Sequence, residues 1–224
     1  MDIFPDRQAL ANAAAKLLAA ALAGPGAGTL VVTGGGTPGP VYDRLSAMDL
    51  GWDRITVTLT DDRRVDGRSP FSNARLVRQR LLVGPAAAAR FVGLTGGGGA
   101  PDDDATAAEA VVRALLPSAA TLLGMGEDGH VASLFPGDPD LAARLDPDGD
   151  RLCVGVPVAG LEPFIPRVSL TVRALLDTRL VVLLITGAAK RAIIERIDAD
   201  PAWAPPVAAV LRQTRAQVRI LSAD

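Results

Sequence analysis

One pattern occurs five times along the chain, and it constrains the fold more than any other feature: a short apolar run that ends in a polar or glycine-rich segment. The strongest run spans residues 179–185 and has the character of a buried strand. The segments that follow the runs are residues 33–37, 61–64, 95–104, 124–130 and 186–190. Alternating strands and helices indicate a parallel sheet, and right-handed crossovers bring the five segments to one sheet edge. We predict a single three-layer α/β/α domain over residues 1–224, with a largely parallel, Rossmann-like sheet.

The expected elements follow from periodicity, β-branched content and the positions of glycine and proline. Strands are expected at residues 29–32, 54–60, 90–94, 119–123, 152–156, 179–185 and 218–221. Helices are expected at residues 7–23, around 41–45, 72–82, 105–116, up to 175 after the stretch 167–171, from 190 to 197, and within 203–211. Residues 61–64 and 95–104 are expected as loops, 137–150 as an exposed excursion, and 131–136 as the start of a helix.

Composition limits the classes of partner. The chain is 49% hydrophobic and 21% charged, with a formal net charge of −2, so it shows no nucleic-acid footprint. Its longest apolar runs are too short or too interrupted to span a bilayer, and the N-terminus lacks the pattern of a signal peptide. We expect a cytoplasmic protein without nucleic-acid or membrane partners. The single cysteine, Cys153, excludes an internal disulfide and a multi-cysteine zinc site.

The only histidine of the chain, His130, follows the expected strand at residues 119–123. Two glycines break the apolar run, and Asp128 stands two residues before the histidine. Ligands of open α/β sheets bind at the carboxyl ends of strands, and histidine titrates near neutral pH. His130 is therefore a candidate for proton transfer. The alternative is a structural histidine bonded to the backbone.

Three further segments indicate an anionic ligand. The run Thr33-Gly-Gly-Gly-Thr-Pro38 lies between a strand and a helix, an arrangement that presents amide N–H groups to a phosphate; the alternative is a plain flexible turn. Asp61, Asp62 and Arg63 cluster at a strand end, where a solvated loop is the alternative. Lys190 lies in a first helical turn, where the helix dipole disfavours a cation unless an anion binds nearby.

These motifs together resemble those of the 6-phosphogluconolactonases, in order, from about residue 29 to residue 194. The stretches that carry the resemblance are Thr33-Gly-Gly-Gly-Thr-Pro38, Asp61-Asp62-Arg63, Gly124-Met-Gly-Glu-Asp-Gly-His-Val-Ala-Ser-Leu-Phe-Pro136, Pro166-Arg167-Val-Ser-Leu-Thr171 and Gly187-Ala-Ala-Lys190. The family usually has Ser where Gly36 stands and Glu where Asp62 stands. The first departure removes a possible hydroxyl donor to phosphate, and the second shortens the reach of a carboxylate.

The resemblance implies a carboxylic-ester hydrolase that converts 6-phospho-D-glucono-1,5-lactone to 6-phospho-D-gluconate, in the oxidative pentose phosphate or the Entner–Doudoroff route. His130 would be the base, while Asp128 would fix its tautomer or bond loop amides. The residues expected to bind substrate are Gly34, Gly35, Gly36, Thr37, Asp61, Arg63, Arg167 and Lys190. We expect no cofactor and no metal, a small sugar-phosphate lactone as the partner, and either a monomer or a weak homodimer.

Two other functions remain open at this point. The related glucosamine-6-phosphate deaminases share the fold and the Asp-Gly-His core, but their pattern ends Phe-Asn-Glu-Pro. Phe135 stands here at the position of that glutamate and cannot relay a proton, which favours the lactonase. A sugar-phosphate-binding module without catalysis would retain the phosphate groups but not the base, and His130 argues against it.

Overall fold

A seven-stranded sheet forms the centre of the computed structural model, which describes residues 1–24, 28–96, 99–157 and 164–224. Every neighbouring pair of its strands is parallel. The strands in sheet order are β1 (Asp2–Ile3), β10 (Gln217–Ala223), β9 (Leu180–Thr186), β6 (Ala120–Gly124), β2 (Gly28–Val32), β3 (Ile55–Leu59) and β5 (Arg90–Val92). The predicted α/β class with its parallel sheet is therefore confirmed. β1, a two-residue edge strand, was not predicted.

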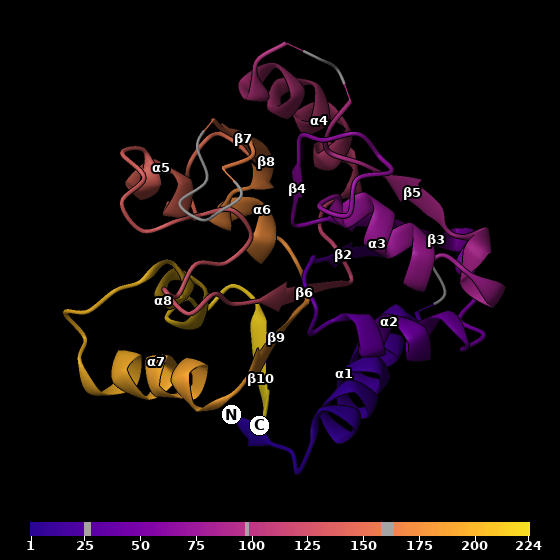
Figure 1. Cartoon of the computed structure of the whole chain (residues 1–224), viewed down its shortest axis with the longest axis horizontal. Helices are drawn as coiled ribbons and strands as arrows, with labels where there is room; N and C mark the ends of the chain where they lie inside the picture. The colour runs from indigo at the N-terminus through magenta and orange to yellow at the C-terminus, as the bar shows by residue number, and fades with distance from the viewer. Residues whose placement is uncertain (25–27, 97–98, 158–163) are drawn as a thin grey trace.

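Helices cover the central sheet on both sides. The helices are α1 (Arg7–Leu22), α2 (Gly39–Ser46), α3 (Asn73–Arg80), α4 (Pro101–Leu115), α5 (Leu141–Leu145), α6 (Val172–Leu176), α7 (Ala188–Ala199) and α8 (Pro206–Leu211). α1 and α2 lie on one side of β9 and β10, and α7 and α8 lie on the other (Figure 1). No helix within the described ranges is both long and apolar enough to cross a membrane.

A second, three-stranded antiparallel sheet corrects two predictions. It consists of β4 (Asp61–Arg63), β8 (Arg167–Leu170) and β7 (Cys153–Val156). Residues 61–63, which were expected in a loop, form β4. Residues 167–170, which were expected to lead into a helix, form β8. The expected helix is α6, and it begins after the cap Thr171. Cross-strand pairing between segments more than a hundred residues apart leaves no local sequence signal.

Other boundaries also differ from the predictions. Residues 131–136 do not begin a helix, because Val131 bridges Leu134 in a tight turn and Ala132 has a positive φ of 50°. α4 begins at Pro101, inside the expected loop 95–104, and its first turn carries three aspartates that the helix dipole favours. Residues 97 and 98 of that loop lie outside the described residues.

The expected excursion at residues 137–150 is only partly an exposed loop. It contains the short helix α5 and the buried Arg144, whose Nη1 lies 2.6 Å from Asp138 Oδ2. The ion pair explains why a charged residue is buried there, because a paired guanidinium avoids part of the cost of leaving water.

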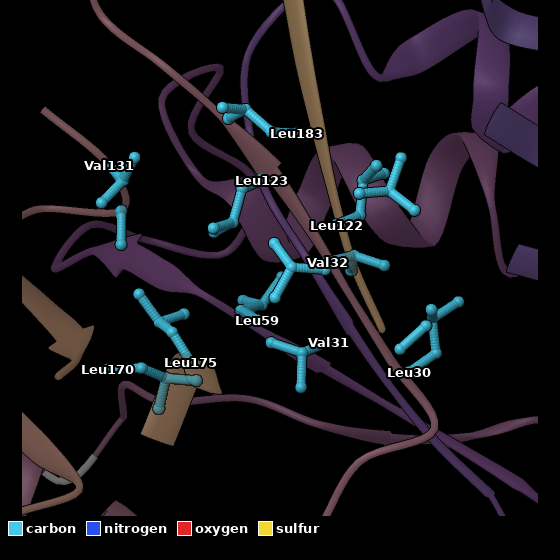
Figure 2. Close-up of a cluster of buried hydrophobic side chains, with 14 of the residues drawn as sticks. Leu30, Val31, Val32, Leu59, Leu122, Leu123, Val131, Leu170, Leu175 and Leu183 are labelled. Carbon is cyan, nitrogen blue, oxygen red and sulfur yellow. The ribbon is translucent and has the colours of Figure 1, made fainter. Parts of the chain in front are cut away.

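One continuous apolar core joins both sheets. Figure 2 shows Leu30, Val31, Val32, Leu59, Leu122, Leu123 and Leu183 of the central sheet together with Leu170 of β8, Leu175 of α6 and Val131. Val131 is fully buried and directly follows His130. The histidine loop is therefore anchored in the core by its neighbouring side chain.

Candidate active site

The glycine turn after β2 is anchored at Thr33 and requires glycine at its next two positions. The Tyr42 hydroxyl of α2 donates to the Thr33 carbonyl, and burial raises the pKa of that hydroxyl far above its ordinary value. A Cβ at Gly34 would lie 1.9 Å from Asn73 Oδ1, and Gly35 has a φ of 93°. Only glycine therefore meets both the close approach and the left-handed backbone.

Gly36 is different from its two neighbours. No atom lies within 4 Å of the position that a Cβ would occupy there, and its φ is not positive. A serine side chain, usual in the related family at this position, therefore fits in the turn. The departure at Gly36 removes a hydroxyl but is not required by packing.

The loop after β6 is folded around the pair formed by His130 and Asp128. His130 Nδ1 lies 2.6 Å from Asp128 Oδ1, which also accepts the His130 backbone N–H at 3.1 Å. The Gly126 N–H donates to the His130 carbonyl at 2.9 Å, and a Cβ at Gly126 would lie 2.2 Å from the imidazole ring. Gly129, with a φ of 79°, turns the chain between the two partners.

The contact with Asp128 sets the chemistry available to His130. Because the carboxylate accepts a hydrogen bond from Nδ1–H, the neutral ring has its lone pair on Nε2. Burial alone raises the pKa of Asp128, but the bonds from the His130 ring and backbone outweigh it and hold that pKa below its ordinary value. Asp128 thus stays ionised and can stabilise an imidazolium.

β4 sends alternate side chains to opposite sides. Asp61 and Arg63 line the cleft with His130, whereas Asp62 and Arg64 line a separate cleft behind the strand. The carboxylate of Asp62 accepts the backbone N–H groups of Arg63, Asn73 and Ala74 at 2.8, 2.7 and 3.2 Å. Burial raises its pKa to about 6, against the effect of these bonds. The shorter side chain at this position therefore caps α3 and does not alter the charge of the catalytic cleft.

Asp61 connects the segments around the cleft. Its Oδ2 accepts the Ser133 hydroxyl at 2.6 Å, and its Oδ1 accepts the Thr60 hydroxyl at 3.0 Å. Its backbone carbonyl accepts Asn73 Nδ2 at 2.8 Å. Arg167 Nη1 lies 4.0 Å from Oδ2. A buried carboxylate with these partners orients the strand, the histidine loop and the arginine together.

Asn73 is a site residue that the sequence reading missed. Its Oδ1 accepts Arg63 Nη1 at 2.6 Å, so it fixes the direction of that guanidinium. Asn73 is the first residue of α3, after the cap Ser72. The sequence predicted the start of this helix, but not that this start faces Arg63 across the cleft.

The predicted residues come together in one cleft of about 240 Å³. Its lining includes the glycine turn, two residues of β4, the histidine, the arginine of β8 and the lysine of α7: Gly34, Gly35, Gly36, Thr37, Asp61, Arg63, His130, Arg167 and Lys190. Asp128 does not line the cleft and lies behind the imidazole. The roles of these residues in binding and catalysis stay predictions.

A family model described as glucosamine-6-phosphate isomerases/6-phosphogluconolactonase matches residues 5–220. The chain belongs to this family. A curated 6-phosphogluconolactonase of Caulobacter vibrioides is 49% identical over 100% of this chain and 97% of the relative, and one of Mesorhizobium japonicum is 41% identical over 94% and 89%. The crystal structure of a 6-phosphogluconolactonase from Shewanella baltica matches with a TM-score of 0.91 and 30% identity, over 100% of this chain and 97% of that one.

Membership in the glucosamine-6-phosphate isomerase/6-phosphogluconolactonase family confirms the predicted resemblance. The family description covers two activities. Phe135, which stands where the deaminase pattern is expected to have its glutamate, is buried and contacts the His130 ring at 4.6 Å between centroids.

The lowered pKa of Asp128 predicts a pH-dependent effect of its removal. The folded protein holds this carboxylate ionised at a lower pH than the unfolded chain does, so the group stabilises the fold above about pH 4 and loses that effect as the pH falls further. Asp128→Asn should lower the free energy of unfolding at pH 7 and have a smaller effect at pH 3, measured by urea unfolding. Asp198→Asn, at an exposed position of α7, is the control. Equal effects of Asp128→Asn at both pH values would contradict the assignment.

Proposed function

We propose that this member of the family is a 6-phosphogluconolactonase, which hydrolyses 6-phospho-D-glucono-1,5-lactone to 6-phospho-D-gluconate. The observation that carries the proposal is a single histidine, held at Nδ1 by a carboxylate at 2.6 Å, in a cleft with two arginines, a lysine and a glycine turn. A base and a phosphate site in one cleft of this size fit a small phosphorylated ester.

The reaction needs one proton acceptor and later one proton donor. Neutral His130 takes a proton at Nε2 from the water that attacks C1, and the water oxygen forms the new bond to that carbon. As the C1–O5 bond breaks, the imidazolium returns the proton to the departing ring oxygen. Asp128 stabilises the imidazolium between the two transfers. Catalysis of this kind contributes about 10²- to 10⁴-fold in rate. The imidazole of His130, held by Asp128, supplies the base in this scheme, which requires no metal.

The negative charge that develops on the carbonyl oxygen needs hydrogen-bond donors nearby. Arg63 is one candidate, since Asn73 holds its guanidinium at the cleft. Amides of the loops that line the same cleft are the other. Both supply fixed donors, and removing a single donor of this type costs about 10²- to 10³-fold in kcat.

The phosphate is bound at the cationic part of the cleft. Arg167 offers a planar fork and Lys190 a point charge, and both are common phosphate partners. The glycine turn leads into α2, so its amides face the same cleft from a helix N-terminus. The bound phosphate also explains a lysine in the first turn of α7, where the helix dipole alone disfavours it.

The deaminase alternative requires a second acid–base group beside the sugar ring. Phe135 occupies that position, so we place the chain with the lactonases. Ammonia release from glucosamine 6-phosphate would instead support the deaminase reading. A non-catalytic binding module would bind the sugar phosphate without turnover, and the ionised Asp128 behind His130 argues for turnover. We also propose that the protein acts in the cytoplasm.

Removal of the imidazole should abolish catalysis. We expect His130→Ala and His130→Gln to lose about 10²- to 10⁴-fold in kcat, because general base catalysis is lost. The measurement is hydrolysis of freshly prepared phosphogluconolactone, corrected for spontaneous opening, with circular dichroism as the check of the fold. A folded variant with an unchanged rate would remove His130 from the mechanism.

The two lysines of the chain provide a matched pair for testing the phosphate site. Lys190→Ala should raise KM by about 10- to 100-fold with kcat largely kept, because a charge-assisted bond to the phosphate is lost. Lys16→Ala, on the exposed face of α1, should leave both constants unchanged. Equal turnover of gluconolactone without a phosphate by the wild-type protein would show that the phosphate site is wrongly assigned.

A further inference from the structure

Phe135 is in contact with both His130 and Arg167. Its ring centroid is 4.6 Å from that of His130, with the two planes at 49°. Arg167 Cζ lies over the same ring, 5.2 Å from its centroid. Phe135 is 2% exposed and packs with Val156 of β7 in a small apolar cluster outside the main core. One aromatic ring is therefore in contact with both functional side chains.

Arg167 has unusually few polar partners for a buried cation. Its side chain is 5% exposed, and its Nε is buried without a hydrogen-bond partner among the described residues. The nearest carboxylate, Asp61, is 4.0 Å away and already accepts the Ser133 hydroxyl. Burial and the adjacent Arg63 lower the pKa of the guanidinium, while Asp61 opposes them. The charge of Arg167 is thus only partly compensated by Asp61, and the face of the Phe135 ring is its other close support.

We propose that Phe135 is a positioning residue, which supports His130 and Arg167 through an apolar surface and adds no further carboxylate beside either of them. The inference rests on the proposed lactonase function. An aromatic face attracts a guanidinium without neutralising it, so Arg167 keeps its charge for the phosphate. The same ring limits the positions that the imidazole can take. It adds no acidic group that would stabilise the protonated form of His130.

A carboxylate at position 135 would change both neighbours at once. It would compete with the phosphate for Arg167, and it would favour the protonated, inactive form of His130. The other charged groups that line the cleft or contact the histidine are Asp128 on its own loop, Asp61 and Arg63 on β4, Arg167 on β8 and Lys190 on α7. Asp128 already stabilises the imidazolium of His130. A second carboxylate nearby would therefore shift the protonation equilibrium of His130 further toward the imidazolium form.

The test compares Phe135→Glu with Phe135→Gln, which has the same shape without the charge, and with Phe135→Leu, which stays apolar but has no aromatic face. For each variant and the wild-type protein, kcat and KM for phosphogluconolactone are measured from pH 5 to pH 8, with circular dichroism as the check of the fold. Competitive inhibition by inorganic phosphate, measured in the same assay, reports on the arginine separately from the KM for the lactone.

Relative to Phe135→Gln, we expect Phe135→Glu to move the acidic limb of the kcat/KM profile upward by about one pH unit or more. Its inhibition constant for inorganic phosphate should rise about tenfold or more. Phe135→Leu should leave the acidic limb in place and raise KM by about 2- to 30-fold, the range spanned by cation–π attraction.

Two results would overturn the proposal. One is an identical pH profile and phosphate inhibition for the Glu and Gln variants, and the other is an unchanged KM in Phe135→Leu. If Phe135→Glu does not fold, the KM of Phe135→Leu decides alone. A wild-type protein without lactonase activity would contradict the proposed function itself. That failure is distinguishable from a failure of the Phe135 proposal, because the variants and the phosphate inhibition are compared only if the wild-type protein is active.

Discussion

The buried carboxylate of Asp61 is the contact on which the geometry of the site depends. It bonds Ser133 in the turn after His130, lies beside Arg167 on β8, and belongs to the strand that carries Arg63. It lies where the central parallel sheet meets the small antiparallel sheet, because β4 follows β3 after one residue. One buried carboxylate thus connects the histidine loop after β6 with the two arginines of the small sheet.

Positive side chains predominate in the cleft. Arg63, Arg167 and Lys190 line it, and Asp61 is the one carboxylate among the lining residues. Asp128 lies behind His130 and Asp62 faces the opposite side of β4. Neither of these two carboxylates lines the cleft. A cleft with this excess of positive charge attracts an anion although the whole chain has a net charge of −2.

Much of the fold and most of the candidate site could be predicted from the sequence, because parallel strands with helices leave a strong periodic pattern and place their loops at one edge. β4 and β8 could not, since Asp61–Arg63 is a charged segment that becomes a strand only through long-range pairing with Arg167–Leu170. The same pairing brings Arg63 opposite Arg167. Asn73 was missed because its contact with Arg63 depends on that strand.

The structure of the protein with 6-phospho-D-gluconate bound tests the central claim most directly. The account predicts that the phosphate lies against Arg167, Lys190 and the glycine turn, and that the carboxylate derived from C1 lies toward His130 Nε2. The reverse orientation, or binding in the cleft behind β4 that Asp62 and Arg64 line, would contradict it.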